Sequence, residues 1–191
     1  MNKISEIQTI LRNHDALIDV LPAQFLPGGM PEVEENGSTY VNNARSKSFA
    51  VLNKLPENAY VLGDDSGIEV DILDGAPGLF SARYAGSNAS CNDNITKMIK
   101  EMKDVPRGQR GGQFISVLVL LSSNQQEKIF TGVCRGKIHT EAVGADGFGY
   151  DSVFIPDGFN KTFAQLGRML KNKICHRRKA IEKLIQYLDS H

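Results

Sequence analysis

The feature that most restricts the fold is a pair of strand-like stretches, residues 113–122 and 128–135, that lie only a few residues apart. Both are rich in the apolar and β-branched residues that strands prefer. The polar residues 123–126 between them fit a tight turn. We therefore expect a β-hairpin, and with it at least one antiparallel strand pair.

Apolar residues at helical spacing predict helices at the start of the chain, over residues 40–54, after Ser90 and at the C-terminus. Thr39 and Ser90 stand where the N-caps of the two middle helices are expected. In the helix over residues 40–54 we expect Phe49 to turn inward. Helical crossovers beside a hairpin indicate an α/β or α+β fold.

Shorter strands are expected before and after the hairpin. Residues 60–63 predict a buried strand, residues 68–72 a half-exposed strand, and residues 153–155 another short one. Asp64 and Asp65 follow the first of these directly. Two neighbouring carboxylates are therefore predicted at the end of a buried strand.

Composition narrows the class of protein. A length of 191 residues suits one domain spanning residues 1–191, and 22 basic residues balance 22 acidic ones, which argues against a strongly basic nucleic-acid-binding protein. Three cysteines without CxxC spacing argue against a zinc site or a redox pair. The most apolar run, residues 114–121, is too short to span a membrane, and no signal-peptide core is seen. A cytoplasmic location is expected.

Two acidic segments are candidates for metal chemistry. In Gly63–Gly67 the carboxylates are of the kind that holds Mg²⁺, although the segment by itself favours an Asp-Ser-Gly turn with side-chain-to-backbone bonds. The segment lacks the G-x-S-x-G pattern, which argues against Ser66 as a nucleophile. The acidic loop over residues 32–35 is ordinarily solvated surface. One of its carboxylates becomes a metal ligand only with a partner such as Asp65.

Two further segments are candidates for nucleotide contacts. The glycine-rich run 144–151 is not G-x-G-x-x-G, but it leaves room for a planar base to stack on Phe148. The alternative is a loop with Phe148 as a core residue. In residues 171–179, five of nine positions are Lys or Arg. At a helix start such residues favour phosphate, and the alternative is a solvated basic face.

Together these segments resemble the inosine triphosphate pyrophosphatase family, which hydrolyses non-standard purine nucleoside triphosphates. The resemblance extends from about Lys3 to the C-terminus. The matching segments are GDDSGIEVDILDGAPGLFSARYAG (63–86), GFGYDSVFIPDG (147–158), KTFAQL (161–166) and KNKICHR (171–177), with shorter matches at Pro31-Glu32 and over residues 39–44.

The resemblance implies a mixed-sheet α/β fold with flanking helices, two lobes around a deep cleft, and a homodimer. The implied reaction converts ITP, dITP or XTP to the monophosphate and pyrophosphate with Mg²⁺, without stable nucleic-acid or membrane binding. By match, Asp65 is the catalytic carboxylate and a metal ligand, and Glu32 is the other ligand. Substrate contacts fall to Lys3, Ser66, Phe148, Gly149, Tyr150, Asp151, Lys171, His176 and Arg177.

The chemistry of the reaction agrees with these roles. Mg²⁺ on Glu32 and Asp65 would polarise a phosphate oxygen, and Asp65 would accept the proton of the attacking water. Donors from Lys171, His176 or Arg177 would favour the 6-keto oxygen of hypoxanthine or xanthine over the amine of adenine. Guanine also carries this oxygen, so its exclusion needs another cause.

The sequence departs from the family pattern at its start. The family opens with a strand ending in T-x-N-x-x-K, whereas here only Met1 and Asn2 precede Lys3, so the first strand is expected to be missing. Asn42, Ser152 and Cys175 replace the usual Glu, Pro and Ser. The alternative function is therefore a nucleotide-binding protein with impaired catalysis. A Maf-like pyrophosphatase is a weaker rival, because the long Asp-Asp-Ser-Gly segment argues against it.

Overall fold

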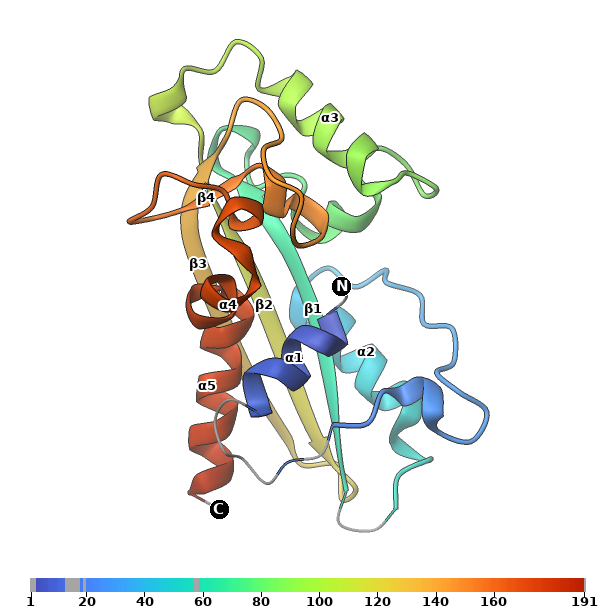
Figure 1. The fold of residues 1–191 in the computed structure, drawn as a ribbon. Helices are drawn as coiled ribbons and strands as arrows, with labels where there is room; N and C mark the ends of the chain where they lie inside the picture. The colour runs from blue at the N-terminus through green and yellow to red at the C-terminus, as the bar shows by residue number, and fades with distance from the viewer. Residues whose placement is uncertain (1–2, 13–17, 19, 57–58, 191) are drawn as a thin grey trace.

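The computed structural model of the chain describes residues 3–12, 18, 20–56 and 59–190. Its helices are α1 (Lys3–Arg12), α2 (Tyr40–Leu52), α3 (Cys91–Glu101), α4 (Phe163–Ile174) and α5 (His176–Asp189). Its strands are β1 (Tyr60–Val70), β2 (Gly111–Ser122), β3 (Glu127–Ile138) and β4 (Phe154–Pro156). Within the described residues the strands form one antiparallel sheet in the order β1-β2-β3-β4 (Figure 1).

The hairpin predicted from the sequence is confirmed as β2 and β3. The two strands pair in register from Leu121 opposite Glu127 to Gly111 opposite Lys137. The caps are confirmed as well. The Thr39 hydroxyl accepts from the Asn42 amide at 3.1 Å, and Ser90 forms a capping box with Asp93 at the start of α3.

The two strands expected over residues 60–63 and 68–72 are in fact one strand, β1, which ends at Val70. It pairs with β2 along its whole length. Its glycines are there for close packing and not for a turn. A Cβ on Gly63 would lie 2.1 Å from the Ala44 carbonyl of α2, and a Cβ on Gly67 would lie 2.4 Å from the Gly78 carbonyl. The Asp64–Asp65 pair therefore lies in the middle of a strand and not at its end.

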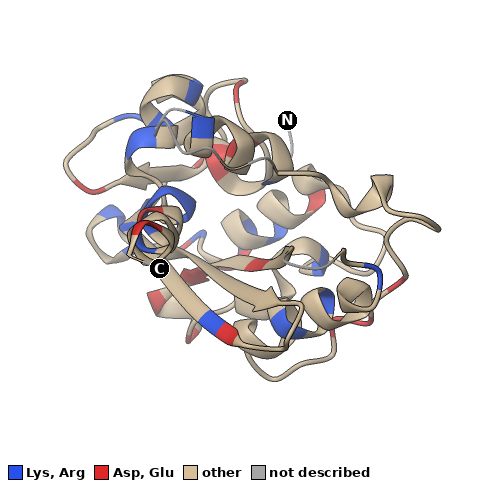
Figure 2. Cartoon of the chain, turned by 90° about the horizontal axis from the view of Figure 1, so that it is seen from below, with Lys and Arg blue, Asp and Glu red and all other residues tan. Residues whose placement is uncertain are grey.

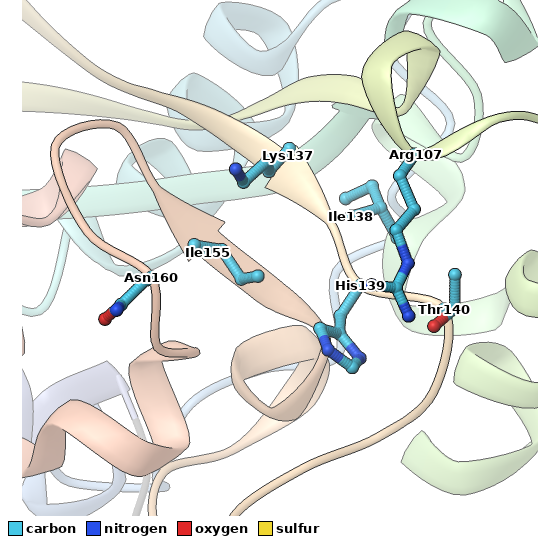
Figure 3. Close-up of a pocket in the computed structure, with 7 residues that line it drawn as sticks. All are labelled: Arg107, Lys137, Ile138, His139, Thr140, Ile155 and Asn160. Atoms are coloured by element: carbon cyan, nitrogen blue, oxygen red, sulfur yellow. The ribbon is translucent and has the colours of Figure 1, made fainter.

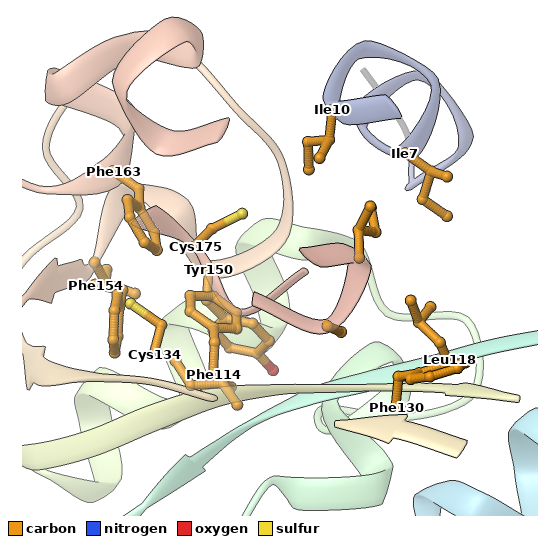
Figure 4. Packing of buried hydrophobic residues seen from close by; sticks show 14 of the residues in the cluster. Ile7, Ile10, Phe114, Leu118, Phe130, Cys134, Tyr150, Phe154, Phe163 and Cys175 are labelled. Atoms are coloured by element: carbon orange, nitrogen blue, oxygen red, sulfur yellow. The ribbon is translucent and has the colours of Figure 1, made fainter. Parts of the chain in front are cut away.

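Helices cover both faces of the sheet. On one face, α1, α4 and α5 pack over the main core, which includes Phe114, Leu118 and Phe154 (Figure 4). On the other face, α2 covers a smaller cluster formed by Ala44 with the β2 residues Val117, Val119 and Leu121. Alternate residues of a strand point to opposite faces, and this assigns each β1 side chain to one helix layer or the other.

Phe49 was predicted to turn inward, and this prediction is wrong, because its side chain is 45% exposed. The buried row of α2 runs through Ala44, Ser48 and Val51. Phe49 lies five residues after Ala44, about 140° around the helix, and therefore points away from the sheet.

Helix α4 is absent from the predicted elements. Gly167, in its middle, has a φ of +76°, and this left-handed residue interrupts the helical path. The interruption removes the continuous apolar spacing by which a helix is found in a sequence. The expected absence of a first strand concerns Met1 and Asn2, which lie outside the described residues, and it stays a prediction together with the two lobes and the deep cleft.

Candidate active site

A buried cluster of charges connects α1, β1 and α5. Arg177, at the start of α5, contacts the Glu6 carboxylate of α1 and lies 3.4 Å from Asp64 Oδ1. Its Nη2 donates to the Ser66 hydroxyl at 3.0 Å. Lys3 Nζ lies 3.0 Å from Asp64 Oδ2. Two carboxylates and a hydroxyl thus contact one guanidinium that is almost wholly removed from water, and Lys3 adds a second positive charge on Asp64.

The electrostatics of this cluster favour the charged forms. Burial alone would raise the pKa of Asp64, but the positive charges of Arg177 and Lys3 outweigh it and hold this pKa well below its usual range. Burial likewise opposes the charge on Arg177, and Asp64 and Glu6 raise its pKa in spite of it. The guanidinium and the carboxylate are therefore both ionised at neutral pH.

Lys171 of α4 extends the cluster toward the glycine-rich loop. Its Nζ lies 2.6 Å from Asp151 Oδ2, 3.1 Å from Glu6 Oε1 and 4.4 Å from the centre of the Phe148 ring. Asp151 in turn accepts from the Phe148 amide at 2.9 Å. Burial raises the pKa of Asp151 although Lys171 works in the opposite direction. Phe148 is half-buried against a cation, so it is not a core residue of the kind the alternative interpretation required.

A second charge group lies on the opposite face of β1. Lys47 of α2 places its Nζ 2.9 Å from Asp65 Oδ1 and 2.8 Å from Glu35 Oε1. Asn43, one turn earlier on α2, donates from Nδ2 to Asp65 Oδ2 at 3.2 Å. Burial lowers the pKa of Lys47, but Glu35 and Asp65 more than compensate, so its pKa is raised. Asp65 is thus held by α2 at both carboxylate oxygens.

The two charge groups meet at β1 because neighbouring residues of a strand point to opposite faces. Asp64 and Ser66 face α1 and α5, whereas Asp65 faces α2. Strand β1 is an edge of the described sheet, so nothing in that sheet separates the two groups beyond the strand itself.

Among the described residues, no three His, Cys, Asp or Glu side chains gather into a ready metal site. The oxygen donors that converge around Lys47 nonetheless fit a hard divalent ion. They are Glu35 Oε1, Asp65 Oδ1 and, at 3.3 Å from Nζ, the Asp64 carbonyl. Mg²⁺ is typically held by one or two carboxylates with water completing its shell. The position already attracts a cation, since an ammonium lies there.

The structure brings together most residues expected in the site. Lys3, Ser66, Asp151, Lys171 and Arg177 share the buried cluster, and Phe148 adjoins it. Five residues of the expected set lie outside this cluster: Asp65, on the opposite face of β1, and Glu32, Gly149, Tyr150 and His176.

Gly149 begins a short 3-10 turn with a φ of +58°. Tyr150 is buried, and its hydroxyl donates to the Ser81 carbonyl at 2.9 Å, which anchors the loop. Glu32 is exposed, and it is Glu35, three residues later in the same loop, that shares Lys47 with Asp65.

Sequence reasoning did not assign Glu6, Asn43 or Lys47 a role, and it left Glu35 as one of the acidic-loop carboxylates that need a partner such as Asp65 to hold a metal. One signal was present for Glu6, a carboxylate beside Ile7 and Ile10 on the apolar face of an amphipathic helix. Asn43 and Lys47 are spaced i and i+4 on α2, which places them on one side of that helix. Neither signal identifies the partners, because these lie far away in the sequence, on α4 and α5 for Glu6 and on β1 for Asn43 and Lys47.

His176 opens α5 and stacks on Phe114, with ring centres 4.7 Å apart and planes 13° apart. Its Nδ1 is buried and has no hydrogen-bond partner among the residues that the structure describes. Burial, followed by the charges of Arg177 and Lys171, lowers its pKa well below the ordinary value of 6.5. The imidazole is therefore neutral in the folded protein at pH 7.

This neutrality predicts a pH-dependent loss of stability. The unfolded chain binds a proton at His176 below about pH 6.5 and the folded chain does not, so acid favours unfolding. Between pH 6.5 and 5.5 the wild type should lose about 1 kcal/mol of unfolding free energy more than His176→Gln does. Urea titrations at the two pH values measure the difference. An equal loss in both proteins would show that His176 takes up its proton without cost in the fold.

A cavity of about 220 Å³ lies elsewhere, at the far end of β3 (Figure 3). It is lined by Arg107, Lys137, Ile138, His139, Thr140, Ile155 and Asn160. None of these residues belongs to either charge group around β1. The cavity is therefore separate from the candidate site.

Comparison with known proteins gives one consistent result. A family model described as the Ham1 family matches residues 1–187. A dITP/XTP pyrophosphatase of Opitutus terrae is 43% identical over 176 residues, which are 92% of this chain and 86% of the relative. A dITP/XTP pyrophosphatase of Oceanobacillus iheyensis is 40% identical over 186 residues, 97% of this chain and 92% of the relative.

Solved structures agree with the sequence matches. The Ham1 protein of Staphylococcus aureus superposes with a TM-score of 0.83 at 37% identity, covering 98% of this chain and 93% of the other. A HAM1 protein from Coxiella burnetii gives a TM-score of 0.86 at 35% identity, covering 99% and 94%. The α/β fold with flanking helices, expected from the sequence, is thereby confirmed, and within the described residues its sheet is antiparallel.

Proposed function

Since this chain belongs to the Ham1 family, we propose that it hydrolyses the deaminated purine nucleoside triphosphates ITP, dITP and XTP to the monophosphate and pyrophosphate. The resemblance to the inosine triphosphate pyrophosphatase family is confirmed, and the enzyme is a hydrolase of phosphoric anhydride bonds. The observation that carries the proposal is the convergence of Lys3, Lys171 and Arg177, from three helices, on the carboxylates of Asp64 in β1 and Glu6 in α1.

The alternative of a nucleotide-binding protein with impaired catalysis is not favoured. The relatives that match over nearly the whole chain are named as pyrophosphatases. Asp65, the proposed catalytic carboxylate, is present and is oriented by Lys47 and Asn43.

The attacking water needs a proton acceptor and the triphosphate needs positive charge. Asp65 is the proposed acceptor, and the Asn43 amide holds its second oxygen. Lys3 and Lys47 would bind phosphate oxygens and neutralise their charge. Because Glu32 is exposed and Glu35 adjoins Lys47, we assign Glu35 and Asp65 as the residues that would hold Mg²⁺. When bound there, the ion supplies Lewis-acid polarisation of a phosphate oxygen.

Base selection follows from hydrogen-bond donors near Phe148. Lys171 and Arg177 would donate to the 6-keto oxygen of hypoxanthine or xanthine while the base packs near the Phe148 ring. Adenine places an amine there instead. A buried donor left without an acceptor costs roughly 1–3 kcal/mol, so two such donors give strong discrimination.

Partners and location complete the proposal. We propose a homodimer that acts in the cytoplasm on free nucleotides and forms no stable complex with nucleic acid. Basic and acidic residues are interspersed along the chain, in keeping with a net charge of zero (Figure 2). In the part of the chain that the structure describes, no helix is both long and apolar enough to cross a bilayer.

The test of base selection compares substrates. With Mg²⁺, kcat/KM for ITP and XTP should exceed that for ATP by at least about a hundredfold, because two donors lose their acceptor with adenine. A coupled assay for pyrophosphate measures the rates. Equal values for ITP and ATP would contradict the roles given to Lys171 and Arg177.

A further inference from the structure

Three oxygen atoms, one from the acidic loop and two from neighbouring residues of β1, converge on the ammonium of Lys47. Glu35 Oε1 lies 2.8 Å away, Asp65 Oδ1 2.9 Å and the Asp64 carbonyl 3.3 Å. The Lys47 side chain is 18% exposed and that of Asp65 only 6%. The ammonium therefore fills the space between the two carboxylates and leaves little room for a second cation.

No other cation of the described residues lies between Glu35 and Asp65. Arg83 approaches Glu35 from elsewhere, with Nη1 3.9 Å from Oε2 and Nη2 donating to the Glu35 carbonyl. Asn43 binds the other oxygen of Asp65. Among the described residues, Lys47 is the cation that contacts both Glu35 and Asp65.

We infer that Lys47 is an internal counter-cation that blocks the divalent-metal position of the nucleotide-free protein, so that metal and triphosphate bind together. The inference rests on the proposed function, which assigns Glu35 and Asp65 to the metal. The oxygens that would hold the ion are those that hold the ammonium, and two cations at this separation repel strongly in a partly buried site. Metal alone therefore binds weakly.

The triphosphate removes this block. Lysine carries its charge on a flexible four-carbon stem, so Nζ can move while the backbone of α2 stays in place. Phosphate oxygens offer the ammonium new anionic partners, and its departure leaves Glu35 and Asp65 with uncompensated negative charge. Nucleotide and metal thus raise each other's affinity, as thermodynamic linkage requires of coupled sites.

The experiment measures binding of Mn²⁺ alone, without nucleotide, from the signal of free Mn²⁺ in electron paramagnetic resonance. Lys47→Met and Lys47→Gln should each bind Mn²⁺ at least about tenfold more tightly than the wild type, because the competing charge is gone. Lys47→Arg, which keeps the charge, should stay within about threefold of the wild type. Lys54→Met, which alters a lysine bound to the Gly29 carbonyl near the end of α2, should leave the affinity unchanged.

Thermal melts without nucleotide add a second readout. Lys47→Met leaves Glu35 and Asp65 facing each other, so its melting temperature should be lower than that of the wild type without metal and should rise more on adding Mn²⁺. If Lys47→Met does not fold, Lys47→Gln carries the test, since its amide still hydrogen-bonds a carboxylate.

The experiment distinguishes a failure of the proposed metal site from a failure of the blocking role of Lys47. If Asp65→Asn binds Mn²⁺ as well as the wild type does, the metal position itself is wrong, and the proposed function loses its metal ligands. If Asp65→Asn weakens Mn²⁺ binding while both neutral Lys47 variants bind no more tightly than the wild type, the metal position stands and the blocking role of Lys47 is overturned.

Discussion

Replacing Asp65 with Asn is expected to lower the turnover of ITP at least about a hundredfold while the protein stays folded. The substitution keeps the size of the side chain but removes the charge that would accept the proton of the attacking water. Loss of such an acceptor typically costs 10²–10⁴-fold in rate. The measurement is kcat for ITP with Mg²⁺, together with the circular dichroism spectrum and the thermal melt of the variant.

Asp71→Asn is the matched control. Asp71 lies directly after β1, and its carboxylate is half-exposed and paired with Arg135 at 2.7 Å. An exposed pair of this kind contributes little to stability, and it lies outside the two charge groups, so turnover should stay within about twofold of the wild type. If Asp65→Asn kept more than about a tenth of the wild-type rate, Asp65 would not be the catalytic carboxylate.

The largest effect on stability is expected for Arg177→Met. The substitution keeps an apolar stem in the core but leaves Glu6 and Asp64 without the guanidinium between them, and both carboxylates are buried. Removing one member of a buried ion pair costs about 3–5 kcal/mol when the charge left behind lacks both a partner and water. Because Lys171 still contacts Glu6 and Lys3 still contacts Asp64, we expect a loss near the lower end of that range. Urea unfolding monitored by circular dichroism gives the difference in free energy of unfolding.

Arg178→Met is the control for this prediction. Arg178 is the next residue, but its guanidinium pairs with Glu182 on the surface of α5, where such a pair contributes about 0.5 kcal/mol. The double variant Glu6→Gln/Arg177→Met should lose less than the sum of the two single losses, since it removes two opposite charges together. Equal effects of Arg177→Met and Arg178→Met would mean that the buried cluster does not stabilise the fold.

The parts of the fold that could be predicted from the sequence are those determined by short-range patterns. The hairpin follows from two strand-like stretches and the few residues between them. The caps at Thr39 and Ser90 follow from side chains that bond amides three residues ahead. In each case the residues that specify the structure lie close together in the sequence and also contact one another in the fold.

The parts of the fold that could not be predicted depend on contacts between elements that lie far apart in the sequence. The glycines of β1 resemble a turn locally, and only the closeness of α2 and the Gly78 carbonyl explains them. Phe49 was assigned to the buried side because it is apolar, whereas α2 lies close enough to the sheet that it buries Ala44 and Ser48 instead. Packing distance between elements is not encoded in the spacing of apolar residues.

The same distinction applies to the candidate site. The types of residue needed for phosphate and metal chemistry are recognisable, and these types together with the family resemblance make Lys171, Arg177 and Asp65 candidates. Within the acidic loop, however, Glu32 and Glu35 are equivalent by chemistry. Only the fold, which brings Glu35 to Lys47 and leaves Glu32 exposed, distinguishes them. Glu6 likewise acquires its role from α4 and α5, far along the chain.

The most direct test of the central claim is the identity of the products. Phosphorus nuclear magnetic resonance of the reaction of ITP with Mg²⁺ separates pyrophosphate from orthophosphate and the monophosphate from the diphosphate. Attack at the α-phosphorus predicts that IMP and pyrophosphate appear together in equal amounts, with no IDP. Release of orthophosphate with IDP would contradict the account, because it would place the attacking water at the terminal phosphate instead.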